Sequence, residues 1–166
     1  MLAPLRRRTW APRGQTPIQK SWDRRDRLSV GAAITLSPHR RRAGLYFRIH
    51  SHNIHFDDTM ELITLVRRHL QRPFILVLDR YNVHRKAVRL LSEKHPRWFS
   101  AEWLPAYAPE LNPVEQVWNH SKYADLANFI PDDVGHLHRQ LYGSLRDQHG
   151  KPGLLRSFFK HTKLSL

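Results

Sequence analysis

Residues 73–118 decide the fold, and they read PFILVLDRYNVHRKAVRLLSEKHPRWFSAEWLPAYAPELNPVEQVW. The segment opens with five consecutive apolar residues, 74–78, and Asp79 follows them directly. A short continuous apolar run predicts a strand that is buried on both faces of an α/β sheet. Because such sheets carry their chemistry at the carboxyl ends of their strands, Asp79 is a candidate site residue.

The rest of this segment predicts a helix over about 85–94, a strand over 99–104 and a second helix after Asn112. Asn112 and Pro113 suit the N-cap and first position of that helix, which carries Glu115 in its first turn. Carboxylates on rigid elements can hold the divalent ions that assist phosphoryl transfer. Spacing alone favours simpler roles, however. Asp79 can cap the turn into the next helix, and Glu115 can complete a capping box with Asn112.

The flanking sequence completes an α+β order that shades into α/β. Strands are expected at 28–36 and 45–49, joined by a turn at 37–44, and a helix is expected at 57–70. A later amphipathic helix is centred on 134–145, and Gly150, Pro152 and Gly153 break the chain before a short tail. We therefore expect one domain over residues 1–150 and a C-terminal tail over 151–166.

The chain is strongly basic, with 28 Lys and Arg against 14 Asp and Glu, a net charge of +14. Residues 1–50 hold 12 of these cations against two aspartates, which leaves +10 in the first third. Clustered positive charge favours nucleic acid as the partner over a membrane, and a basic solvated surface is the simpler alternative. The candidate DNA contacts are Arg6, Arg7, Arg8, Arg13, Arg40, Arg41 and Arg42.

Three further features limit the function. The absence of cysteine excludes disulfides and thiolate metal sites, and no apolar run is long enough to span a membrane. The N-terminus lacks the pattern of a secretory signal. His50, His52 and His55 lie close together, but no nearby carboxylate completes a metal-binding set of known spacing, so a polar loop is the favoured interpretation.

Two motifs resemble a known family. LVLDRYNVHR at 76–85, followed by WLPAYAPELNPVEQVWNHSK at 103–122, is similar to the carboxyl-terminal half of DDE transposases of bacterial insertion sequences, in the mariner-like superfamily. RRRTWAPRGQTP at 6–17 resembles the segment that follows the first catalytic Asp of that family. The resemblance covers roughly residues 5–140. The 35 residues between Asp79 and Glu115 are also similar to the interval of the family.

The resemblance implies an RNase H-like mixed sheet flanked by helices, and metal-dependent cleavage and transfer of DNA strands at transposon ends. Asp79 and Glu115 would be catalytic metal ligands, with Asn82, His84 and Asn112 in support. The implied cofactor is Mg²⁺ or Mn²⁺, with two ions in the complete site. The implied partner is double-stranded DNA, and the protein would act in the bacterial cytoplasm at the nucleoid, as a homodimer or fused to an upstream-frame product.

One departure from the family affects activity. The first Asp of the family ends a strand just upstream of the RRTWAP-like segment, where this sequence already has Met1. That central strand would lie between the hairpin 28–49 and the strand 74–78, so we expect the chain alone to be weak or inactive. A catalytically dead DNA-binding remnant is the alternative, and another RNase H-like nuclease is a third interpretation.

Overall fold

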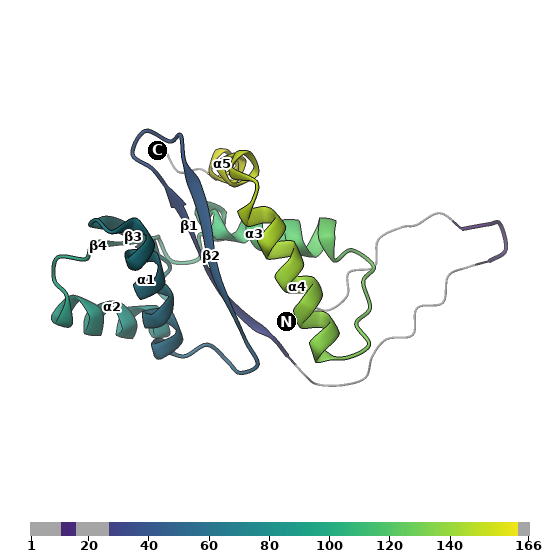
Figure 1. Ribbon diagram of the computed structural model, residues 1–166, viewed down its shortest axis with the longest axis horizontal. Coiled ribbons are helices and arrows are strands. Elements are labelled where there is room, and N and C mark those ends of the chain that lie inside the picture. The colour runs from purple at the N-terminus through teal and green to yellow at the C-terminus, as the bar shows by residue number, and fades with distance from the viewer. Residues whose placement is uncertain (1–10, 16–26, 163–166) are drawn as a thin grey trace.

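The computed structural model describes residues 11–15 and 27–162 (Figure 1). The strands are β1 (Ser29–Leu36), β2 (Ala43–His50), β3 (Phe74–Leu78) and β4 (Phe99–Trp103). The α-helices are α1 (Phe56–Leu70), α2 (Asn82–Lys94), α3 (Val114–His120), α4 (Val134–His149) and α5 (Pro152–Lys160). A 3₁₀ turn at Pro109–Leu111 precedes α3, and a π-helical turn at Ser121–Asp125 follows it. The elements expected between residues 28 and 145 are confirmed.

The four strands form two separate two-stranded sheets. β1 and β2 form an antiparallel hairpin whose register runs from Ser29 opposite His50 to Leu36 opposite Ala43. β3 and β4 are parallel, with Phe74 opposite Phe99 and Leu78 opposite Trp103. A parallel pair needs a crossover connection, and α2 provides it.

Each sheet contributes to its own hydrophobic cluster. The first cluster joins the hairpin to α3, α4 and α5, and its most deeply buried members are Leu45, Val117, Leu141, Leu145 and Leu155. The second cluster joins α1 and α2 to β3 and β4 through Ile63, Val88, Leu91 and Phe99. Helix α1 also contacts both strands of the hairpin and so connects the two halves of the molecule (Figure 1).

The prediction that residues 74–78 are buried on both faces is wrong. Phe74, Leu76 and Leu78 pack into the second cluster, but Ile75 and Val77 point the other way and are 70% and 50% exposed. Helices α1 and α2 supply the packing of this cluster, whereas α4 and α5 pack against β2. The described part of the chain therefore leaves the outward face of β3 uncovered.

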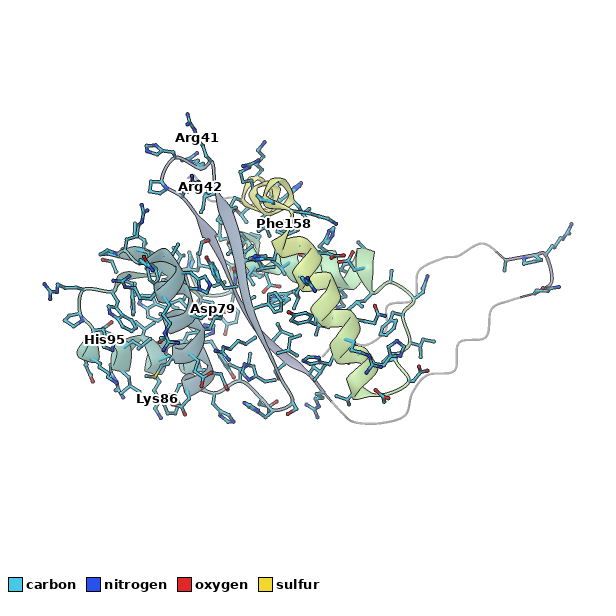
Figure 2. All side chains as sticks on the ribbon, in the orientation of Figure 1. Arg41, Arg42, Asp79, Lys86, His95 and Phe158 are labelled. Carbon is cyan, nitrogen blue, oxygen red and sulfur yellow. The ribbon has the colours of Figure 1, made fainter. Side chains whose placement is uncertain are left out.

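The segment after Gly150 also differs from the expected tail. Pro152 occupies the start of α5, a position where proline is tolerated because the first turn needs no backbone donor. The side chains of Leu155 and Phe158 are buried in the first cluster. Figure 2 labels Phe158 on α5. The residues that were expected to break the chain instead begin a helix of the core.

In the part of the chain that the structure describes, no helix has the length and apolar character needed to cross a membrane.

Candidate active site between the two clusters

Asp79 is the first residue after β3, as the sequence predicts. Its Oδ1 accepts a hydrogen bond from the backbone N–H of Tyr81 at 3.1 Å and lies 2.6 Å from Nδ1 of His84. These two contacts fix the turn that leads into α2. No hydrogen bond to its other oxygen, Oδ2, occurs among the described residues, and the side chain is half-exposed. The aspartate therefore shapes the turn and still presents one oxygen to solvent.

Glu115 lies in the first turn of α3, which the buried Val117 anchors in the first cluster. The start of this helix is capped by Asn112, whose Oδ1 accepts the N–H of Val114 at 3.1 Å. The backbone N–H of Asn112 donates to the carbonyl of Pro109 at 2.9 Å. A capping box would require that N–H to bond to the Glu115 side chain. Because it is already used, the capping-box alternative is wrong and the Glu115 carboxylate has no capping role.

The two carboxylates, Asp79 and Glu115, lie close enough to interact electrostatically. Partial burial raises the pKa of Glu115, and the negative charge of Asp79 raises it further. Like charges act on each other in this way only at short range, because solvent and salt screen exposed charges beyond about 10 Å. A strand end from one cluster and a helix start from the other thus form one acidic pair. Such a pair suits a divalent cation, which removes the repulsion by binding to both groups.

The three residues expected to support the site have different surroundings. His84 contacts Asp79 directly. The Asn82 side chain accepts a hydrogen bond from the guanidinium of Arg85, so it belongs to the surface of α2. Asn112 holds the start of α3 and thereby positions the backbone of Glu115. Of the three, only His84 directly contacts one of the two carboxylates among the described residues.

Arg40, Arg41 and Arg42 lie exposed at the tip of the β1–β2 hairpin, and Figure 2 labels Arg41 and Arg42 there. Backbone hydrogen bonds between Ser37 and the arginine segment close this turn, at 2.7 and 2.9 Å. Arg156 of α5 donates to the carbonyl of Arg41 at 2.6 Å and adds a fourth cation. No ion pair satisfies the three tip arginines among the described residues, so their charge faces solvent.

The remaining predicted arginines lie near the N-terminus. Arg13 is exposed in a turn that the N–H of Gln15 closes by bonding to the carbonyl of Pro12 at 3.0 Å. Arg6, Arg7 and Arg8 lie outside the described residues.

The sequence did not predict one group of side chains that the structure brings together. His50, His52 and Asp58 offer ligand atoms that all lie within 4.8 Å of one another. The missing carboxylate of the histidine-rich segment is thus Asp58, which reaches the histidines from the first turn of α1.

Comparison with known proteins identifies the fold and the family. The structure is similar to that of the Mos1 strand transfer complex, with a TM-score of 0.57 and 18% sequence identity. The likeness covers 99% of this chain and 52% of that one, so the chain spans about half the length of its solved relative. The chain therefore has an RNase H-like fold, as expected.

A family model described as "DDE superfamily endonuclease" matches residues 1–137. The chain belongs to this superfamily, whose members generally use divalent metal ions. A comparison with curated proteins found no match.

Proposed function

We propose that this chain is the catalytic part of a transposase that cleaves and joins DNA strands at transposon ends. The single observation that carries this proposal is the placement of Asp79 near Glu115, close enough for its charge to raise the pKa of Glu115. They come from the carboxyl end of a parallel strand and from the first turn of a packed helix. The superfamily and the likeness to a strand transfer complex support the same chemistry.

The donor atoms fit a hard divalent cation, Mg²⁺ or Mn²⁺. Within the described residues, the Glu115 carboxylate and Oδ2 of Asp79 have no hydrogen-bond partner, so both are free to bind a metal. When bound, a pair of such ions neutralises charge on the attacking and leaving oxygens of a phosphodiester. Asp79 and Glu115 would hold them. His84 is a positioning residue, because its ring nitrogen contacts Oδ1 of Asp79 and orients Oδ2.

The basic hairpin tip supplies a surface for DNA. Arg40, Arg41 and Arg42 present three exposed guanidinium groups, which match the geometry of phosphate oxygens. We assign to them contacts with the DNA backbone that position double-stranded DNA without reading its sequence. Arg13 and the arginines at 6–8 would extend this surface. Because DNA is the substrate, we place the protein in the bacterial cytoplasm, at the nucleoid.

The sheet topology bears on activity. Within the described residues β1 pairs only with β2, and β3 pairs only with β4. An RNase H-like sheet would join these pairs through a central strand that carries the first carboxylate of the family. We propose that a strand from outside the described residues takes this place, supplied by an upstream-frame product. The two-carboxylate site alone would then be weak.

Cleavage of transposon-end DNA tests this proposal. The chain is incubated with Mg²⁺ and a labelled duplex, with and without a polypeptide that carries the upstream strand. We expect cleavage that requires Mg²⁺, rises with the added polypeptide and falls at least about a hundredfold in Asp79→Asn and Glu115→Gln. Glu110→Gln is the matched control, since Glu110 is an exposed carboxylate in the loop before α3. Cleavage unaffected by the first two variants would contradict the assignment.

A DNA-binding remnant without activity is the second candidate, and the unpaired arginines of the hairpin tip favour it. It predicts salt-dependent binding of the same duplex with no cleavage under any metal condition. An RNA–DNA hybrid is included as a further substrate. Preferential cleavage of the hybrid would point to another RNase H-like nuclease.

A further inference from the structure

The connection between β2 and α1 contains a second cluster of ligand-type side chains, independent of the Asp79–Glu115 pair. His50 is the last residue of β2, His52 lies in the loop, and Asp58 is in the first turn of α1. The Nδ1 atom of His50 lies 3.3 Å from Oδ1 of Asp58. The Nε2 atom of His52 lies 3.2 Å from both oxygens of the same carboxylate.

These separations also match those between neighbouring ligands of a metal ion. Charge-assisted hydrogen bonds between nitrogen and oxygen are about 2.7–2.9 Å long. In a tetrahedral site with metal–ligand bonds of 2.0–2.1 Å, neighbouring ligand atoms lie about 3.3 Å apart. His52 Nε2 is equidistant from the two carboxylate oxygens, at the long end of the hydrogen-bond range.

Two other histidine–aspartate pairs in this protein give an internal comparison. His84 lies 2.6 Å from Asp79, and His136 lies 2.9 Å from Asp132, both at hydrogen-bond length. His120 lies 3.7 Å from Asp125, but no second imidazole joins that pair in the described part of the chain. The set at 50–58 thus combines two imidazoles, one carboxylate and separations longer than those of the His84–Asp79 and His136–Asp132 pairs.

The cluster is also held in place before any ion binds. The backbone N–H of His55 donates to Oδ2 of Asp58 at 2.8 Å, which fixes the carboxylate and leaves Oδ1 for a ligand. The side chains of His50 and Asp58 are only 12% and 15% exposed, whereas that of His52 is 53% exposed. Because the carboxylate of Asp58 is already held in place and the imidazole of His52 is exposed, an ion can reach the cluster from solvent.

The space beside the cluster can hold an ion with its water ligands. His50 and Asp58 line an open hollow of about 480 Å³ together with Glu61 and with His138 and Tyr142 of α4. Two imidazole nitrogens with one carboxylate favour zinc-class transition metals, whereas Mg²⁺ prefers oxygen ligands. Three protein ligands leave at least one coordination position for water.

We propose that His50, His52 and Asp58 form a binding site for a zinc-class transition-metal ion that ties the end of β2 to the start of α1. This site does not depend on the proposed function. The ion would stabilise the junction between the hairpin and α1, the helix that connects the two halves of the molecule.

Calorimetric titration of the untagged chain with ZnCl₂, after removal of trace metals, tests the site. The titration is carried out in an Asp79→Asn/Glu115→Gln background, so that the acidic pair does not bind the ion. Co²⁺ is a second probe, because its visible absorption reports the geometry of its ligands. We expect one ion per chain, no competition from Mg²⁺, and a rise in Tm of about 5 °C at a hundredfold excess over Kd.

Two variants and one control decide the outcome. His52→Ala removes an exposed ligand, and Asp58→Asn keeps an acceptor for the His55 N–H while removing the charge. Each should weaken Zn²⁺ binding at least about tenfold. His39→Ala, in the exposed hairpin turn, removes one histidine without touching the cluster and should bind like the parent chain. Equal Zn²⁺ affinity in all three variants, no binding by the parent chain, or effective competition by Mg²⁺ would each overturn the proposal.

Discussion

The negative charge of Asp79 raises the pKa of Glu115, although 35 residues lie between them in the sequence. Asp79 follows a strand of one hydrophobic cluster, and Glu115 begins a helix that is anchored in the other. The acidic pair therefore depends on how the two clusters pack together, and α1 contacts α2 and both strands of the hairpin. Substitutions that loosen this packing should weaken the site without touching either carboxylate.

The first prediction concerns this coupling. Asp79→Asn removes the like charge, so the pKa of Glu115 should fall. It should remain above its ordinary value of 4.5, since burial is the larger cause of the shift. NMR titration of the Glu115 side-chain carboxyl carbon measures this directly. Asp132→Asn, which changes an exposed aspartate near the start of α4, should leave the titration unchanged. An identical pKa in Asp79→Asn and the parent would show that the two groups do not interact.

The second prediction follows from the raised pKa of Glu115. A group whose pKa is higher in the folded state binds its proton more tightly there, so its contribution to stability is lost as pH rises above 4.5. Glu115→Gln mimics the protonated form. The variant should therefore be more stable than the parent at pH 7, and the difference should shrink as pH falls toward 4.5 and be small below it. Urea unfolding at both pH values tests this. A variant that is less stable at pH 7 would disagree with the sign.

The third prediction concerns the hairpin tip. Replacing Arg40, Arg41 and Arg42 by Gln should weaken binding of duplex DNA and reduce the slope of log K against log[salt] by about 2–3, because each phosphate contact contributes about 0.9. Fluorescence anisotropy at several salt concentrations gives this slope. The matched control replaces three exposed cations on or just after α2, namely Arg89, Lys94 and Arg97. Equal losses in the two triple variants would indicate nonspecific charge and no defined DNA surface.

The fourth prediction concerns α5. Leu155 is fully buried in the first cluster, so Leu155→Ala should lower the free energy of unfolding by about 2–5 kcal/mol. Lys160→Ala, on the exposed side of the same helix, should change it by less than about 0.5 kcal/mol. Chemical denaturation measures both. A change of less than about 0.5 kcal/mol in the free energy of unfolding of Leu155→Ala would contradict a core role for α5 and indicate a loosely attached tail.

Much of the fold was predictable because its signals are local. The strands predicted at 74–78 and 99–104 are set by neighbouring residues, and the structure confirms both, the second ending at Trp103. Asn112 accepts the N–H of Val114 at the start of α3, although the N-cap position itself is Pro113. The exposure of Ile75 and Val77 was not predictable, since it depends on which helices cover that face of the sheet. The same limitation applies to α5, where Pro152 begins a helix only because Leu155 and Phe158 find a core to enter.

The two candidate sites differ in the same way, because one could be predicted from local sequence and the other could not. The Asp79–Glu115 pair was predicted from family motifs, because a strand end and a helix start are recognisable in sequence. The His50–His52–Asp58 cluster was not predicted, since a loop and a helix start must fold back on each other to form it. The local pattern around Asp58 explains its role at the start of α1 and gives no sign of the histidines.

Joint binding of a divalent ion by Asp79 and Glu115 is tested most directly by adding Mn²⁺ to the isotopically labelled chain and following the broadening of its amide NMR signals. We predict that the signals of residues 78–81 and 114–117 broaden together, with the same dependence on Mn²⁺ concentration. Both effects should disappear in Asp79→Asn and in Glu115→Gln. Broadening of one segment alone, or broadening near Asp79 that persists in Glu115→Gln, would contradict a shared metal site.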